Sequence, residues 1–120
     1  MTKILLVEDE LALRETLEEI LELNNFEVSV AESGEEALES LQNSAPDLIV
    51  SDIMMPGITG LELIAKVHQQ AQFKQIPFIF LSALASKEDQ NKGIIAGAKG
   101  YITKPFKASE LLALIRELLG

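Results

Sequence analysis

The organisation of the chain is most evident in residues 46–60, which read PDLIVSDIMMPGITG. Leu48–Val50 is a short and unbroken apolar run, which is typical of a strand covered on both faces. The acidic residue Asp52 follows this run directly and leads into a turn rich in glycine. A carboxylate at the end of a buried strand raises the question of which groups lie beside it.

Four other segments have the same short, apolar or β-branched character and are predicted to be strands. They are Lys3–Val7, Phe26–Val30, Phe78–Leu81 and Tyr101–Thr103.

Helical patterns separate these strands. In Leu11–Leu23 the apolar residues Leu13, Leu17, Ile20 and Leu21 recur at helical spacing, while Arg14 and several glutamates fall elsewhere and are assigned to the polar face. A last helix is predicted over Ala108–Leu119. Three more helices are expected to begin at the capping sequences Ser33-Gly34-Glu35-Glu36, Thr59-Gly60-Leu61-Glu62 and Ser86-Lys87-Glu88-Asp89.

The alternation of strand and helix occurs five times and predicts an α/β fold. Right-handed crossovers then give a five-stranded parallel sheet with helices on both faces. The length of 120 residues corresponds to one domain, residues 1–120. We expect either a stand-alone domain or a part of a longer protein with a C-terminal output domain.

Composition narrows the classes of function. Ten basic and nineteen acidic residues give a formal net charge of −9, which argues against direct nucleic-acid binding because that depends on lysine and arginine contacts to phosphate. There is no cysteine, so thiolate metal sites and disulfides are excluded. The apolar runs are far shorter than the roughly 18 residues of a membrane span. We therefore expect a cytoplasmic protein without membrane contact.

Polar residues follow several of the predicted strands. Glu8 and Asp9 follow the first, Asp52 the third, Ser82 the fourth and Lys104 the fifth. Each has a purely structural explanation, since Asp9 could cap the next helix, Ser82 could bond to the backbone and Lys104 could be solvated. Parallel strands, however, end at one edge of the sheet, where ligands bind in open α/β folds. The convergence of three acids, a hydroxyl and a lysine at that edge favours a functional site.

Four motifs carry a family resemblance: LLVEDE, DLIVSDIMMPGITGLEL, FIFLSA and GAKGYITKPF. Together they make the chain resemble the receiver domain of a two-component response regulator, of the chemotaxis-regulator type, over essentially all 120 residues. The resemblance implies the doubly wound, flavodoxin-like (βα)5 fold with strand order 2-1-3-4-5.

The resemblance also implies a metal site beside a phosphoacceptor. Asp52 would accept the phosphoryl group, and Mg²⁺, with Mn²⁺ as a substitute, would be held by Asp9 and Asp52 directly and by Glu8 through water. The backbone carbonyl of Met54 would be a further ligand.

Three other positions would respond to the phosphoryl group. Ser82 and Lys104 would bind it, and Tyr101 would act as an aromatic switch that follows Ser82. The resemblance also implies a cis bond between Lys104 and Pro105. The positions that border the phosphoryl group would be Met54, Ala83 and Leu84.

The implied function is a phosphoacceptor switch of a His–Asp phosphorelay. Its partners would be a sensor histidine kinase or a histidine phosphotransfer protein, and an output domain or protein that docks on the fourth helix, fifth strand and fifth helix. A phosphorylation-dependent homodimer is compatible with this surface. The domain would catalyse only its own phosphotransfer and dephosphorylation, so we do not class it as an enzyme. The single histidine, His68, is interpreted as a surface residue.

Three alternatives compete with this interpretation. A flavodoxin-like cofactor binder would need phosphate-binding groups where this chain has Glu8-Asp9-Glu10, and a phosphatase of the Asp-x-Asp type would need an acid where it has Met54. The more serious alternative is a pseudo-receiver, a protein-interaction module that is not phosphorylated. Such modules usually lack a metal acid, the acceptor or the lysine, all of which are present here.

Overall fold

The computed structural model describes all 120 residues and contains one five-stranded parallel sheet. Its strand order is β2-β1-β3-β4-β5, which confirms the predicted fold class and order. The strands are β1 (Lys3–Val7), β2 (Glu27–Ala31), β3 (Leu48–Ser51), β4 (Phe78–Ser82) and β5 (Gly100–Thr103).

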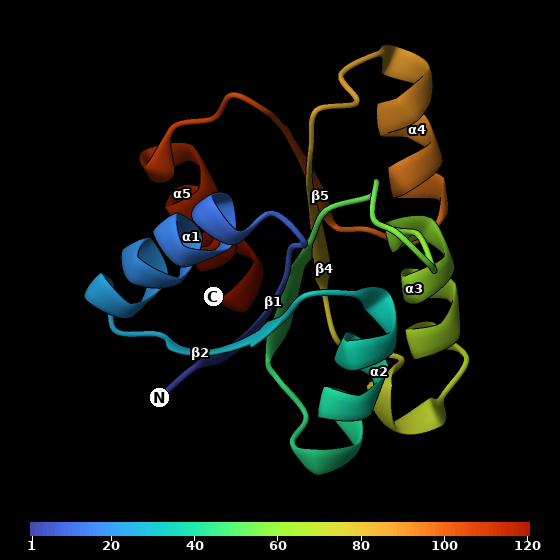
Figure 1. Ribbon diagram of the computed structural model, residues 1–120, viewed down its shortest axis with the longest axis horizontal. Coiled ribbons are helices and arrows are strands. Elements are labelled where there is room, and N and C mark those ends of the chain that lie inside the picture. Colours follow the sequence, from blue (N-terminus) through green and yellow to red (C-terminus); the bar gives the residue numbers. More distant parts are fainter.

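Five α-helices and one short 3₁₀ helix connect the strands. Helices α1 and α5 cover one face of the sheet, and α2, α3 and α4 cover the other (Figure 1). The helices are α1 (Leu11–Leu23), α2 (Gly34–Asn43), α3 (Gly60–His68), η1 (Ala71–Phe73), α4 (Lys87–Ile95) and α5 (Ala108–Leu119). None of them is both long enough and apolar enough to cross a lipid bilayer.

The two helical layers explain the unbroken apolar strands. Alternate residues of a strand point to opposite faces, so Ile4 of β1 packs in the cluster that contains Leu17 of α1 and Ile115 of α5. Leu5, its neighbour, packs in the cluster that contains Leu63 of α3. Because both faces are covered, β3 and β4 bury every position, as the sequence pattern predicts.

Three helices begin at the predicted caps. Thr59 forms a complete capping box with Glu62, in which each side chain accepts a hydrogen bond from the other residue's backbone N–H. The hydroxyls of Ser33 and Ser86 accept from the backbone three residues on, but the reciprocal bond is absent in both. These caps fix where α2, α3 and α4 start, and hence the lengths of the loops that follow the strands.

The strand boundaries predicted from the sequence agree with the structure to within one residue at every strand end. The largest omission was η1, a single turn with no apolar periodicity of its own. The assignment of Arg14 to the polar face of α1 was wrong, because this side chain is buried.

The parallel register brings the strand ends to one edge of the sheet. Val7 of β1 pairs with Ser51 of β3, and Ser82 of β4 pairs with Thr103 of β5. The residues that follow these four positions therefore start from neighbouring points at the same edge.

Candidate phosphoacceptor and metal site

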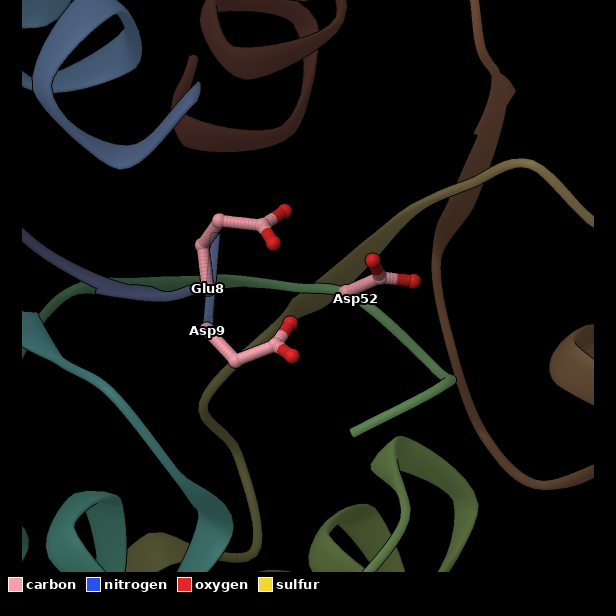
Figure 2. A group of neighbouring side chains, drawn as sticks. All are labelled: Glu8, Asp9 and Asp52. Atoms are coloured by element: carbon pink, nitrogen blue, oxygen red, sulfur yellow. The ribbon is translucent and has the colours of Figure 1, made fainter. Parts of the chain in front are cut away.

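Three carboxylates gather at the carboxyl edge of the sheet. Glu8 and Asp9 follow β1, Asp52 follows β3, and their side chains extend to the same side (Figure 2). One carboxylate oxygen from each lies within 4.8 Å of the others. Glu8 and Asp52 are buried, whereas Asp9 is exposed. The predicted cluster of acids is thus formed, with one member open to solvent.

Lys104, which follows β5, is directed at this cluster. Its Nζ donates hydrogen bonds to Asp52 Oδ2 at 2.9 Å and to Glu8 Oε1 at 3.1 Å. The peptide bond from Lys104 to Pro105 is cis, as the resemblance implies. The lysine is therefore not a solvated surface group but the counter-ion of two buried acids.

The carboxylate of Asp52 is fixed through both of its oxygens. Oδ1 accepts from the backbone N–H of Ile53 at 2.6 Å and of Met54 at 3.3 Å, while Oδ2 accepts from Lys104. Only 9% of the residue remains exposed. The side chain is thus held in one orientation and is mostly shielded from solvent.

Burial and charge act in opposite directions on the pKa values of the site. Burial raises the pKa of Glu8, although the N–H of Glu10 and the ammonium of Lys104 partly counter it. Burial alone would lower the pKa of Lys104, but the bonds and charges of Asp52 and Glu8 outweigh it, so that pKa is raised. Proximity to the carboxylates therefore keeps the ammonium charged.

The donors at this edge fit a hard divalent cation. Three carboxylates face one ammonium, which leaves two formal negative charges uncompensated within 4.8 Å. Oxygen ligands of this kind are those that Mg²⁺ takes, and like charges so close together repel unless a cation joins them. The acids at positions 8, 9 and 52 can accordingly hold a metal ion.

The side chains of Ser82 and Tyr101 both form hydrogen bonds with the backbone of Leu84 and none with Asp52. The Ser82 hydroxyl accepts from the backbone N–H of Leu84 at 3.2 Å, and the Tyr101 hydroxyl donates to the Leu84 carbonyl at 2.6 Å. Ser82 is completely buried, while Tyr101 and Leu84 are half-buried. The structural explanation for Ser82, a bond to nearby backbone, is thus realised in this structure.

Other predicted positions can be placed in the same way. Asp9 does not cap α1, whose N-cap is Glu10 and has no side-chain bond. Met54, with 62% exposure, and Ala83 are exposed at this edge of the sheet.

His68 is not the surface residue that the sequence suggested. It is half-buried, its Nε2 lies 3.0 Å from the carbonyl of Ile76, and its ring packs edge-on against Phe78. It lines a cavity of about 260 Å³ together with Lys74 and Lys99, at the edge where β4 and β5 begin. The cavity is therefore distant from the acids.

Sequence reasoning missed one residue near the site, Arg14. Its guanidinium donates to the backbone carbonyl of Glu8 and to the carboxylate of Glu32, both at 3.0 Å. An arginine in a helix otherwise rich in glutamate carries no sign of burial in the sequence. Its proximity to the Glu8 carbonyl arises only when α1 packs beside the ends of β1 and β2.

Comparison with known proteins agrees with the geometry. Residues 4–116 match the family model of the response regulator receiver domain. The chain is 38% identical over 119 residues to the phosphate regulon transcriptional regulatory protein PhoB of Rhizobium meliloti, covering 99% of this chain and 52% of that protein. It thus spans about half the length of the curated relatives it matches.

Solved structures show the same similarity. The chemotaxis protein CheY4 of Vibrio cholerae is 35% identical, with a TM-score of 0.93 over 99% of both chains. The non-phosphorylated HemR receiver domain of Leptospira biflexa is 34% identical, with a TM-score of 0.90 over 100% of this chain and 95% of that one.

The fold and the acidic edge thus define a signalling module of the two-component class. The chain belongs to the response regulator receiver domain family. Domains of this family are typically signalling modules rather than enzymes. The cluster of Glu8, Asp9 and Asp52 is consistent with a phosphoacceptor site.

Proposed function

We propose that this domain is a phosphorylation switch in which Asp52 accepts a phosphoryl group from a phosphohistidine. The donor would be a sensor histidine kinase or a histidine phosphotransfer protein. The observation that carries the proposal is the placement of three carboxylates within 4.8 Å of one another, opposite the ammonium of Lys104.

Asp52 has the properties that a nucleophile in this reaction requires. Its carboxylate is oriented by the N–H groups of Ile53 and Met54, and it has no proton to lose, so no general base is needed. A carboxylate oxygen forms a bond to phosphorus while the bond from phosphorus to the donor imidazole breaks. The imidazole leaves with that electron pair.

The neighbouring acids would hold the divalent cation. Asp9 and Asp52 would be direct ligands, Glu8 would act through water, and Met54 would contribute its carbonyl oxygen. When bound, Mg²⁺ or Mn²⁺ neutralises charge that develops on the transferring phosphoryl group. Asp9 is suited to its role because it is the exposed member of the cluster and has no hydrogen bond to give up.

Lys104 and Ser82 would then respond to the new anion. The Lys104 ammonium, already 2.9 Å from Asp52 Oδ2, would pair with phosphoryl oxygens. The Ser82 hydroxyl would lose the hydrogen bond that it accepts from the Leu84 N–H and would donate one to the phosphoryl group. Met54, Ala83 and Leu84 would border that group and influence how readily water removes it.

Leu84 connects this response to Tyr101. Its N–H donates to Ser82 and its carbonyl accepts from Tyr101, so movement of Ser82 disturbs the bond that holds the tyrosine. Tyr101 would rotate inward as a result. A charge added at Asp52 would thereby change the surface formed by α4, β5 and α5.

That surface is the one we assign to the downstream partner. Ile94 and Ile95 of α4 are 49% and 84% exposed, which gives it an apolar contact area. The partner would be an output domain, a separate protein or, in a phosphorylated homodimer, a second copy. With a net charge of −9, the domain itself would not contact nucleic acid.

Mass spectrometry of the intact protein tests the proposal. Incubation with Mg²⁺ and a small acyl phosphate should add the mass of one phosphoryl group, and a chelator or the substitution Asp52→Asn should abolish the adduct. Asp47→Asn is the matched control, because Asp47 precedes the same strand at its opposite end. Failure of the unsubstituted protein to form any adduct would support the pseudo-receiver alternative.

A further inference from the structure

Arg14 is a buried cation that joins the ends of two strands. Its side chain is 9% exposed, one Nη donates to the backbone carbonyl of Glu8, and the other pairs with Glu32 beyond β2. Glu32 is 65% exposed, so only one end of this contact is open to water. A guanidinium has the fixed, forked geometry needed to hold two such acceptors at once.

The contact restrains the peptide unit that links two acids of the metal site. The Glu8 backbone N–H donates to Ala31, its side chain accepts from Glu10 and Lys104, and its carbonyl accepts from Arg14. The Asp9 side chain has no hydrogen bond of its own in this structure. The position from which it extends is set by the Glu8–Asp9 peptide, whose carbonyl accepts the hydrogen bond from Arg14.

We propose that Arg14 is a positioning residue for the divalent-cation site. It never contacts the ion but holds the Glu8–Asp9 turn so that both carboxylates face Asp52. The inference rests on the proposed function, since it assumes that these acids bind Mg²⁺.

Charge and positioning predict opposite results, which makes the proposal testable. A cation close to a metal site repels the metal, so removal of Arg14 would strengthen Mg²⁺ binding if charge were its only effect. Loss of the restraint on the turn would weaken binding instead, because groups that orient metal ligands typically contribute 10-fold or more to affinity.

The experiment measures Mg²⁺ affinity by calorimetry on the full chain with Arg14→Met, Arg14→Lys and Arg116→Met. Arg116 is the only other arginine and is exposed on α5, so its substitution removes the same charge. Arg14→Met should weaken binding about tenfold, Arg14→Lys should weaken it less, and Arg116→Met should leave it unchanged. Ile115→Val, a core substitution far from the acids, controls for lost stability, with circular dichroism to confirm folding.

Wild-type or tighter Mg²⁺ binding by a folded Arg14→Met would overturn the inference. If that variant does not fold, wild-type affinity in Arg14→Lys would overturn it equally. Failure of the proposed function would give a different result. The unsubstituted protein would then bind no Mg²⁺, or the Asp9→Asn variant would bind Mg²⁺ with the same affinity as the unsubstituted protein. If Asp9→Asn abolishes Mg²⁺ binding and Arg14→Met leaves it unchanged, only the proposed role of Arg14 is contradicted.

Discussion

The ammonium of Lys104 bridges Asp52 and Glu8, two buried carboxylates that follow different strands, with distances of 2.9 Å and 3.1 Å. It is the only cation that reaches them, and it ties the end of β5 to the ends of β1 and β3. The same carboxylates are those we assign to the metal. Lys104 and a divalent cation therefore compensate the same negative charge, and loss of one should increase dependence on the other.

Substitution of this lysine should make stability depend on metal. Without metal, Lys104→Met leaves two buried carboxylates unpaired and should lower the free energy of unfolding by about 1–3 kcal/mol. Saturating Mg²⁺ should recover most of this loss, because it binds the variant more tightly than the wild type. Urea denaturation with chelator or with Mg²⁺ measures both effects.

The matched control for that experiment is Lys107→Met, because Lys107 is exposed and forms no ion pair. It should change neither stability nor its response to Mg²⁺. Equal metal-free stability of Lys104→Met and wild type would contradict the structural role of the bridge.

Tyr101 should titrate above its ordinary value of 10.0, because burial, with smaller contributions from nearby acids, raises its pKa. The folded protein then holds this proton to higher pH than the unfolded chain. The stability contributed by Tyr101 is fully present below pH 10.0 and is lost as the pH rises from there through the folded-state pKa. Tyr101 is the only tyrosine and there is no tryptophan, so ultraviolet absorbance follows it alone. If the titration midpoint of Tyr101 in the folded protein is no higher than its midpoint in the urea-unfolded chain, the prediction is refuted.

Gly93 should determine where the Tyr101 ring lies. A Cβ at Gly93 would be 2.9 Å from Cδ2 of Tyr101 and 3.1 Å from the ring of Phe80. Phe80 is completely buried, whereas Tyr101 can swing outward, so Gly93→Ala should break its bond to Leu84. The Tyr101 titration midpoint should fall toward its ordinary value.

Stability is a poorer measure of this change, since alanine gains about 1 kcal/mol of helix propensity that offsets the lost bond. Asn91→Ala, at an exposed position of the same helix, is the control and should leave the midpoint unchanged. An unshifted midpoint in Gly93→Ala would show that the ring is not held as described.

The fold could be predicted where local pattern and burial agree. Leu48–Ser51 is buried at every position, so its apolar run identifies a central strand, and the Thr59 cap marks the start of α3. The strand order came from the family resemblance, because periodicity does not say which strands are neighbours. The 3₁₀ turn Ala71–Phe73 has too few residues to show a period.

The site was predictable from residue types but not from contacts. The acids and Lys104 were found because they follow strands that end at one edge. The burial of Arg14 depends on how α1 packs against the loops after β1 and β2, and the T-shaped contact of His68 with Phe78 depends on where α3 meets β4. Such tertiary contacts leave no trace in local sequence. The same holds for the direction of the Ser82 hydroxyl.

The central claim is that the acids at positions 8, 9 and 52 share one divalent cation. Paramagnetic broadening of amide signals by Mn²⁺, added below one equivalent, tests it most directly. The account predicts that amides at Glu8–Glu10 and Asp52–Met54 broaden first, that those near Ile76 and Lys99 do not, and that Mg²⁺ reverses the effect. Broadening spread over the exposed glutamates of α1, with no preference for the two acidic turns, would contradict it.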